Sequence, residues 1–183
     1  MLKVSEQRGD TWVDRDSPAT FAKESLKSGT ERLVIGLPRS STNTFRRLAE
    51  AMSEPFFVLY VLHTSRGEGE SGRYQSEEIS RAKLDKFLER FEGFLSGDAR
   101  HDLWVRSISD GDLIVWNRHN TIFAYGDLAK FIHKLGELGF RDQQPPTLGD
   151  HLHHYRPEFD AEAADVLSAL EWYRTPLRPE DEQ

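Results

Sequence analysis

Residues 102–125 predict three short strands joined by two tight turns, and this meander restricts the possible folds more than any other segment. Asp110-Gly111 lies in the first turn, where glycine supplies the positive φ that a hairpin turn requires because it has no Cβ. Asn117 and Asn120 in the second turn tolerate the same backbone region better than most residues. The predicted strands are 102–108, 113–116 and 121–125. The chain therefore contains a folded domain with an antiparallel sheet.

Two apolar segments ahead of the meander predict strands on either side of a helix. Residues 32–37 form a β-branched run, and residues 56–62 are apolar on both faces, as in a strand that is covered on both sides. Between them, Phe45, Leu48 and Met52 recur with helical spacing. A strand, a helix and a strand within about thirty residues indicate a βαβ unit with parallel strands and a right-handed crossover.

Four more helices are expected from capping residues and apolar periodicity. They span about 17–29, 76–97, 126–138 and 158–173. Ser76 is the expected N-cap of the longest helix, and Gly139-Phe140 fits a Schellman ending in which Phe140 folds back on Leu135. The last helix carries an apolar stripe, formed by Phe159, Ala163, Val166, Leu167 and Leu170. The tail that follows it, residues 177–183, is expected to be disordered.

These elements together predict an α+β (mixed α/β) fold. We expect a mixed sheet of about five strands, with a parallel βαβ pair, an antiparallel three-strand meander and helices packed on it. A chain of 183 residues fits one globular domain. Within it, residues 1–30 would form an N-terminal arm and short helix, 31–140 the α/β core domain, and 141–183 an acidic linker, helix and disordered tail.

Composition excludes several classes of function. The chain has no cysteine, which rules out disulfides, thiol catalysis and cysteine-ligated metals. Residues 141–183 carry 4 positive and 10 negative charges, whereas residues 31–140 carry 15 and 16, so no basic stripe suits nucleic acid. The longest apolar run, residues 56–62, is far shorter than the about 18 residues of a membrane span, and no signal peptide is visible. We expect a soluble, cytoplasmic, acidic protein that binds neither nucleic acid nor membrane.

Two loops predict a site for an anion. The loop 38–43 joins a strand to the start of a helix, where free backbone amides and the helix dipole attract negative charge. If the two flanking strands are parallel, the loop 63–73 emerges at the same edge of the sheet, where ligands commonly bind. The candidate ligand-binding residues are Arg39, Ser40, Ser41, Thr42, His63, Arg66 and Arg73. The competing interpretation is that serine and threonine at a helix start are ordinary caps.

Histidines crowd the segment 150–154. His151 and His153 would share a face of an extended chain, whereas His151 and His154 would share a face of a helix, and either pair could supply two metal ligands. No third ligand stands at a recognised spacing, so we expect solvated linker histidines, no bound metal and no cofactor. His119, in the second meander turn, could act as a general base, but turn chemistry explains its surroundings sufficiently.

The segment 67–72 matches the pattern G-x-G-x-x-G, but a dinucleotide loop is disfavoured. Glu68 and Glu70 would lie beside the phosphates, and the helix would begin too far downstream. A polar connection is the preferred interpretation. Three aromatic residues of the meander, Trp104, Trp116 and Tyr125, are expected to pack in the core or on the sheet face.

Two functions remain consistent with these patterns. The first is a non-catalytic binding protein with an unknown protein partner, or one that self-associates through the C-terminal helix. The second is a small enzyme or sensor that binds a phosphorylated or carboxylated metabolite at the 38–43 and 63–73 loops. The first is preferred because no specific catalytic motif stands in the sequence.

Overall fold

The structure, a computed structural model, describes residues 2–40 and 42–181, apart from the side chain of Ser40. Within that range it contains five α-helices, three short 3-10 helices and twelve strands, which form a nine-stranded sheet and a three-stranded sheet. The fold is therefore of mixed α and β structure, as predicted. No helix of the described residues is long and apolar enough to cross a membrane.

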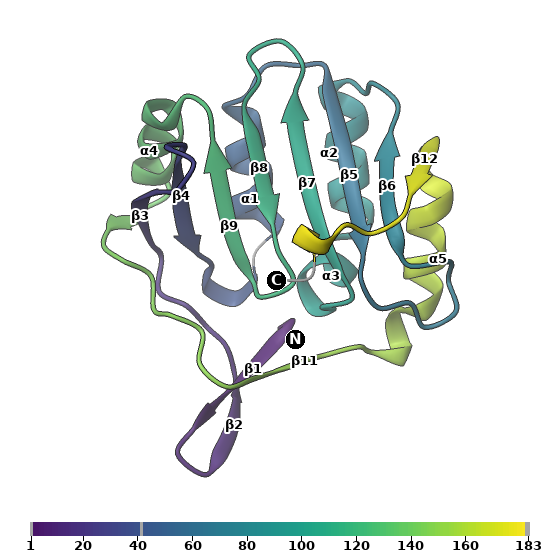
Figure 1. Cartoon of the computed structure of the whole chain (residues 1–183), viewed down its shortest axis with the longest axis horizontal. Helices are drawn as coiled ribbons and strands as arrows, with labels where there is room; N and C mark the ends of the chain where they lie inside the picture. The colour runs from purple at the N-terminus through teal and green to yellow at the C-terminus, as the bar shows by residue number, and fades with distance from the viewer. Residues whose placement is uncertain (1, 41, 182–183) are drawn as a thin grey trace.

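The main sheet has the strand order β10-β3-β4-β9-β8-β7-β5-β6-β12 (Figure 1). Its strands are β3 (Thr20–Ser25), β4 (Glu31–Gly36), β5 (Phe56–Leu62), β6 (Gly72–Ser76), β7 (His101–Ser107), β8 (Leu113–Trp116), β9 (Thr121–Tyr125), β10 (Arg141–Asp142) and β12 (Trp172–Thr175). Of the strand pairs in this sheet, β10–β3 is parallel and the others are antiparallel. The meander β7-β8-β9 occupies its centre, and Gly111 has the positive φ, +78°, that its turn requires.

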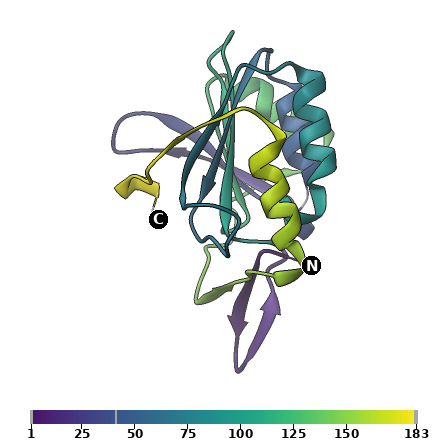
Figure 2. The ribbon, with the colours of Figure 1, turned by 90° about the vertical axis from the view of Figure 1, so that its right-hand side faces the viewer.

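All five helices lie on one face of this sheet, whereas the C-terminal tail crosses the opposite face (Figures 1 and 2). The helices are α1 (Thr42–Glu50), α2 (Arg81–Arg90), α3 (Glu92–Gly97), α4 (Leu128–Glu137) and α5 (Asp160–Ala169). The core fills the space between the helices and the sheet. Trp116 of β8 is fully buried there, with its ring centroid 5.8 Å from that of Phe45 of α1. One face of the sheet therefore carries none of these five α-helices.

A small second sheet ties the N-terminus to a late segment of the chain. It has the order β11-β1-β2, with strands β1 (Val4–Arg8), β2 (Thr11–Asp14) and β11 (His151–His153). Strand β1 pairs with both of the others in antiparallel orientation, and Val4 lies opposite His153. This sheet lies below the lower edge of the main sheet in the view of Figure 1.

The prediction of about five strands with a parallel βαβ pair was wrong in detail. The sheet has nine strands, and the three meander strands lie between β4 and β5. Four successive antiparallel pairings connect β4 to β5, so the two strands run in the same direction without touching. The apolar periodicity correctly identified α1 as the helix that connects β4 to β5. Local sequence does not show which strands will lie between β4 and β5 in the sheet.

One predicted helix was wrong, and another was wrong at its start. Instead of a helix over 17–29, the chain forms β3, because six of its residues find partners on β4. The helix predicted from Ser76 begins after Ser80, whose side chain accepts a hydrogen bond from the Lys83 amide. Ser76 itself ends β6, and its Oγ accepts a hydrogen bond from the Val58 amide at 2.9 Å. In both places strand pairing outweighs a weak local preference, and at β3 the partner β4 follows directly in the chain as a hairpin.

The later helices were predicted more closely. At the end of α4, Phe140 N donates to Leu135 O at 2.9 Å and Gly139 N donates to Gly136 O at 3.0 Å, which confirms the Schellman ending. The last helix is shorter than predicted, because Trp172–Thr175 forms strand β12 and pairs with β6 instead of continuing the helix. Part of the expected disordered tail, Pro179–Asp181, is a 3-10 turn.

Candidate functional site

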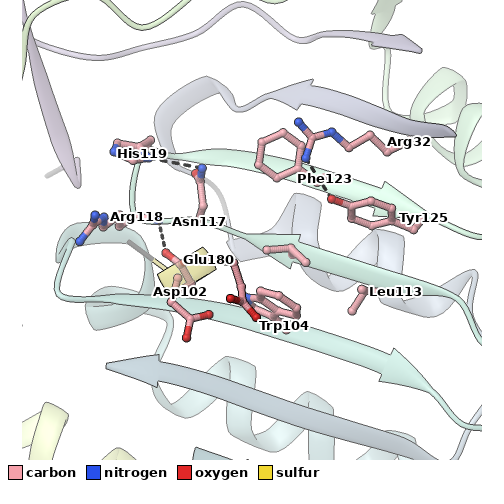
Figure 3. A pocket seen from close by; sticks show the side chains of 12 residues that line it. Arg32, Asp102, Trp104, Leu113, Asn117, Arg118, His119, Phe123, Tyr125 and Glu180 are labelled. Carbon is pink, nitrogen blue, oxygen red and sulfur yellow. Dashed lines mark hydrogen bonds between the residues drawn. The ribbon is translucent and has the colours of Figure 1, made fainter. Parts of the chain in front are cut away.

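The helix-free face of the main sheet carries two neighbouring hollows. The first has a volume of about 240 Å³, and its floor combines Trp104, Leu113, Val115 and Phe123 (Figure 3). The second has a volume of about 450 Å³ and lies mainly over strands β5, β6 and β7. Its lining residues are Phe57, Leu59, Arg73, Gln75, Trp104, Arg106, Ile108 and Leu113. Because Trp104 and Leu113 line both hollows, the two adjoin each other, and together they are called the sheet groove below.

Strand alternation places these side chains together. Successive side chains of a strand point to opposite faces, so Leu103 and Val105 enter the core while Trp104 and Arg106 face the groove. The same alternation sends Ile114 and Trp116 of β8 inward and leaves Leu113 and Val115 on the groove face. The groove is therefore a direct consequence of the meander that the sequence predicts.

Arginines stand around this apolar floor. The Arg32 guanidinium lies 4.0 Å from the ring centroid of Phe123, and its Nη1 donates to the Tyr125 hydroxyl at 3.0 Å. The Arg73 guanidinium lies 5.3 Å from the ring centroid of Trp104. Arg106 is exposed and makes no hydrogen bond or ion pair with another described residue. Cationic groups over aromatic rings suit an anionic ligand that also has apolar parts.

The acidic tail of the chain reaches into this groove. Glu180 and Asp181 line the first hollow, and the Asp181 carboxylate forms an ion pair with the Arg73 guanidinium. The Asp181 side chain is only 2% exposed, and its second oxygen accepts a hydrogen bond from Arg178 N at 2.8 Å. Trp104 Nε1, by contrast, is buried and has no hydrogen-bond partner among the described residues. The groove thus already binds the Asp181 carboxylate, while the Trp104 N–H and the Arg106 guanidinium stay unused by the described part of the chain.

The residues predicted around the 38–43 loop face the helix layer and the N-terminal segment. Arg39 is exposed, has a positive φ of +52°, and donates its backbone N–H to Asp16 Oδ1 at 2.9 Å. Thr42 is buried and its hydroxyl donates to Glu92 O at 3.3 Å. The side chain of Ser40 and the whole of Ser41 lie outside the described residues. An anion site at this loop stays a prediction.

The three residues predicted from the 63–73 loop each face a carboxylate of the chain itself. His63 Nε2 lies 3.1 Å from Asp102 Oδ2, although the two are not aligned for a hydrogen bond. Arg66 pairs with Asp160 at 3.0 Å on the surface, and Arg73 pairs with Asp181. The β7, β8 and β9 strands separate this loop from residues 38–43, so the structure does not bring the two predicted loops together.

The predicted histidines divide into two groups. His151 and His153 of β11 lie beside His119 of the β8–β9 turn, with ring centroids 4.9 to 5.1 Å apart. His154 points away from them, and its Nε2 lies 2.8 Å from the Ser5 hydroxyl. Burial, together with the smaller effects of the His151 and Arg118 charges, lowers the pKa of His119 to about 4. Burial, together with the smaller effects of the His119 and Arg118 charges, lowers the pKa of His153 to about 3. Both rings are therefore neutral at pH 7.

The G-x-G-x-x-G segment leads into strand β6 rather than into a helix, so it presents no helix N-terminus to a phosphate. Glu68 of this loop turns inward instead and pairs with the buried Arg100 at 3.1 Å. Arg100 also pairs with the buried Asp98 and with Asp160. Burial lowers the pKa of Arg100, but the hydrogen bonds of these carboxylates outweigh it and raise the pKa above its usual value.

Several residues of the site were missed by sequence reasoning. Arg106 and Asp181 carried no motif, and Trp104 was interpreted only as packing. The alternation of Trp104 and Arg106 with buried residues was the available signal, because it places an aromatic ring and a cation on one face of a strand. Nothing local showed that this face would lack a helix, or that Asp181 would reach it.

The chain matches no protein-family model, and neither the curated proteins nor the solved structures include a significant match to it.

Proposed function

We propose that this protein is a non-catalytic binding protein whose sheet groove holds an acidic segment of a partner protein. The observation that carries the proposal is the position of Asp181. This residue belongs to a short acidic tail, and Arg73 holds its carboxylate in the groove. A segment of another protein with the same chemistry would find the same complement of charge and apolar surface.

The composition of the sheet groove supports this reading. Protein interfaces are enriched in aromatic residues and arginine, and a few such residues dominate the binding energy. The groove offers Trp104 and Phe123 as anchors, with Arg73 and Arg106 beside them. The unpartnered Trp104 Nε1 would donate to a carboxylate or to a backbone carbonyl of the bound segment.

The tail would compete with such a partner. Since the Asp181 carboxylate already pairs with Arg73, an incoming acidic segment must displace residues 179–181 to reach the Arg73 guanidinium. Weakening the contact between the tail and the groove should therefore strengthen the binding of an added peptide, because the tail would occupy the groove in a smaller fraction of the molecules. This expectation separates the groove from a merely cationic surface, which would show no such competition.

Calorimetric titration of the full chain with an oligo-glutamate peptide tests the proposal. Asp181→Asn should increase the affinity for the peptide, and Arg106→Gln should reduce it by about tenfold, the equivalent of one hydrogen bond to a charged group. Arg141→Gln is the matched control, because Arg141 is exposed on the outermost strand β10 and its loss changes the net charge equally.

Three results would refute the proposal: no binding of the peptide by wild type or by Asp181→Asn, equal losses in Arg106→Gln and Arg141→Gln, or no response to Asp181→Asn. A parallel titration with acetate and with inorganic phosphate addresses the carboxylated or phosphorylated metabolite. Tighter binding of either small anion than of the peptide would favour the metabolite instead of a protein partner.

A further inference from the structure

Three histidines from distant parts of the sequence meet beyond one end of the sheet groove. One ring nitrogen of His119 and one each of His151 and His153 all lie within 4.8 Å of one another. His119 also lines the first hollow of the groove, so this cluster borders it (Figure 3). We propose that His119, His151 and His153 form a binding site for a divalent zinc ion. This inference is independent of the proposed function of the groove.

The backbone on both sides of the cluster is fixed. Asn120 has a positive φ of +61° in the β8–β9 turn, and Asn117 Oδ1 accepts a hydrogen bond from Thr121 N at 2.9 Å. Asp102 Oδ1 accepts a hydrogen bond from Arg118 N at 2.6 Å, which holds the residue next to His119. Strand β11 is held by β1, where Glu6 lies opposite His151 and Val4 opposite His153. The three rings therefore project from ordered elements rather than from free loops.

Two of the three rings have a nitrogen that a metal could engage. His151 Nδ1 lies 3.0 Å from Gly149 O, and a carbonyl oxygen only accepts, so Nδ1 carries a proton, and in the neutral imidazole Nε2 then holds the lone pair. His153 Nε2 is buried and finds no hydrogen-bond partner within the described part of the chain. A buried polar atom without a partner is unfavourable by about 1–3 kcal/mol, so a ligand that engages it has a thermodynamic advantage.

Ligand type and geometry select the ion. Three imidazoles and no thiolate suit a borderline metal such as zinc, which takes four tetrahedral ligands and in open sites keeps one position for water or a bound molecule. Nitrogens bound to one tetrahedral zinc ion lie about 3.4 Å apart, so the rings need to close by about an ångström on binding. Small rotations about the side-chain torsions of His119 and of the two β11 histidines would supply this shift.

A zinc ion at this site would cross-link two parts of the fold. The segment 143–157 between β10 and α5 pairs with β1 through β11, and hydrogen bonds of Pro146, His154 and Arg156 also hold it. Zinc would add a link from β11 to the main sheet at His119. Zinc would bind the three histidines only where folding brings them together, and the unfolded chain lacks this arrangement. Zinc should therefore raise the melting temperature and slow amide exchange in β11.

Titration of the untagged full chain with Zn²⁺ or Co²⁺, after treatment with a chelator, tests the proposal. We expect one ion per chain, a rise in melting temperature with Zn²⁺, and the intense visible absorption of tetrahedral cobalt with Co²⁺. His119→Gln and His153→Gln should each weaken binding by at least about 100-fold, because loss of an outer-shell partner alone weakens metal binding about 10- to 100-fold.

Two controls keep the test specific. His133→Gln removes a histidine whose side chain is 78% exposed on α4, and His154→Gln removes the neighbour that turns toward Ser5; both should leave binding unchanged. If a variant fails to fold, nitrogen-15 spectra of the wild-type imidazoles identify the ligands directly. The proposal is wrong if the wild type binds no zinc at micromolar concentration, if binding depends on His154 but not on His119, or if the three imidazoles show no shift.

Discussion

The buried ion cluster around Arg100 allows the sharpest prediction about stability. The Arg100 side chain is fully buried, and its guanidinium donates to Asp98 at 2.9 and 3.0 Å, to Glu68 at 3.1 Å and to Asp160 at 3.0 Å. Arg100→Met keeps the approximate length of the side chain and removes the charge. Two buried carboxylates, of Asp98 and Glu68, then lose their counter-ion.

The expected loss of stability follows from what the carboxylates keep. Breaking a buried ion pair by removing one partner costs about 3–5 kcal/mol. The Asp98 carboxylate retains two backbone donors, Arg100 N at 2.9 Å and Arg156 N at 2.8 Å, so we expect the lower part of that range, about 3–4 kcal/mol. For a domain of this size that change lowers the melting temperature by about 6–16 °C.

Urea denaturation and thermal melting of Arg100→Met, compared with Arg66→Gln, provide the assay. Arg66 shares the partner Asp160 but is 33% exposed, and an exposed pair of this kind contributes about 0–1 kcal/mol. The deficit of Arg100→Met should shrink at low pH, since the stranded carboxylates can then take up protons. If Arg100→Met is as stable as Arg66→Gln, or if its deficit grows on acidification, the buried charges do not stabilise the fold in this way.

Three further changes test other parts of the structure. Lys3 is fully buried with its Nζ 4.1 Å from the Trp116 ring centroid, and burial lowers its pKa to about 7. In the unfolded chain this lysine keeps its proton up to a pH of about 10.4, so the free energy of unfolding of the wild type should rise between pH 7 and pH 10. Lys3→Met should flatten this rise, measured as the urea midpoint at each pH. An unchanged slope in Lys3→Met would contradict the assignment. Gly126→Ala should lower the free energy of unfolding by about 2 kcal/mol or more, since strain at positive φ alone costs about 1–3 kcal/mol and the new Cβ would lie 2.0 Å from Asp112 Oδ1. Gly111→Ala, at a φ of +78° with nothing within 4 Å, shows the strain without the clash, so equal losses in chemical denaturation would refute the steric argument. Deleting residues 158–183 removes α5 and β12, which should expose the β6 edge and an apolar patch and cause aggregation in gel filtration; a monomer with an unchanged melting temperature would show that the segment is dispensable.

The sequence by itself determined the elements with strong local signals. The meander with its Asp110-Gly111 turn, the α1 helix with its apolar periodicity and the Schellman ending at Gly139-Phe140 all form as predicted. In each of these, the residues that fix the conformation are close together in the chain. Backbone sterics and short-range hydrogen bonds therefore suffice to specify them.

Tertiary structure decided the identity of the remaining strands and of the candidate sites. Strand β12 exists because the distant strand β6 pairs with it, although the local sequence favoured helix or loop. Strand β3 pairs with the next strand, β4, so here the sequence reasoning missed a local hairpin. The sequence also placed His151 and His153 on one side of an extended strand, but their third neighbour, His119, lies about thirty residues earlier in the chain. Asp181 likewise meets Arg73 only because the tail crosses the helix-free face of the sheet. Such pairings depend on how distant segments pack, and the free energy of that packing belongs to the whole fold and not to any local stretch of residues.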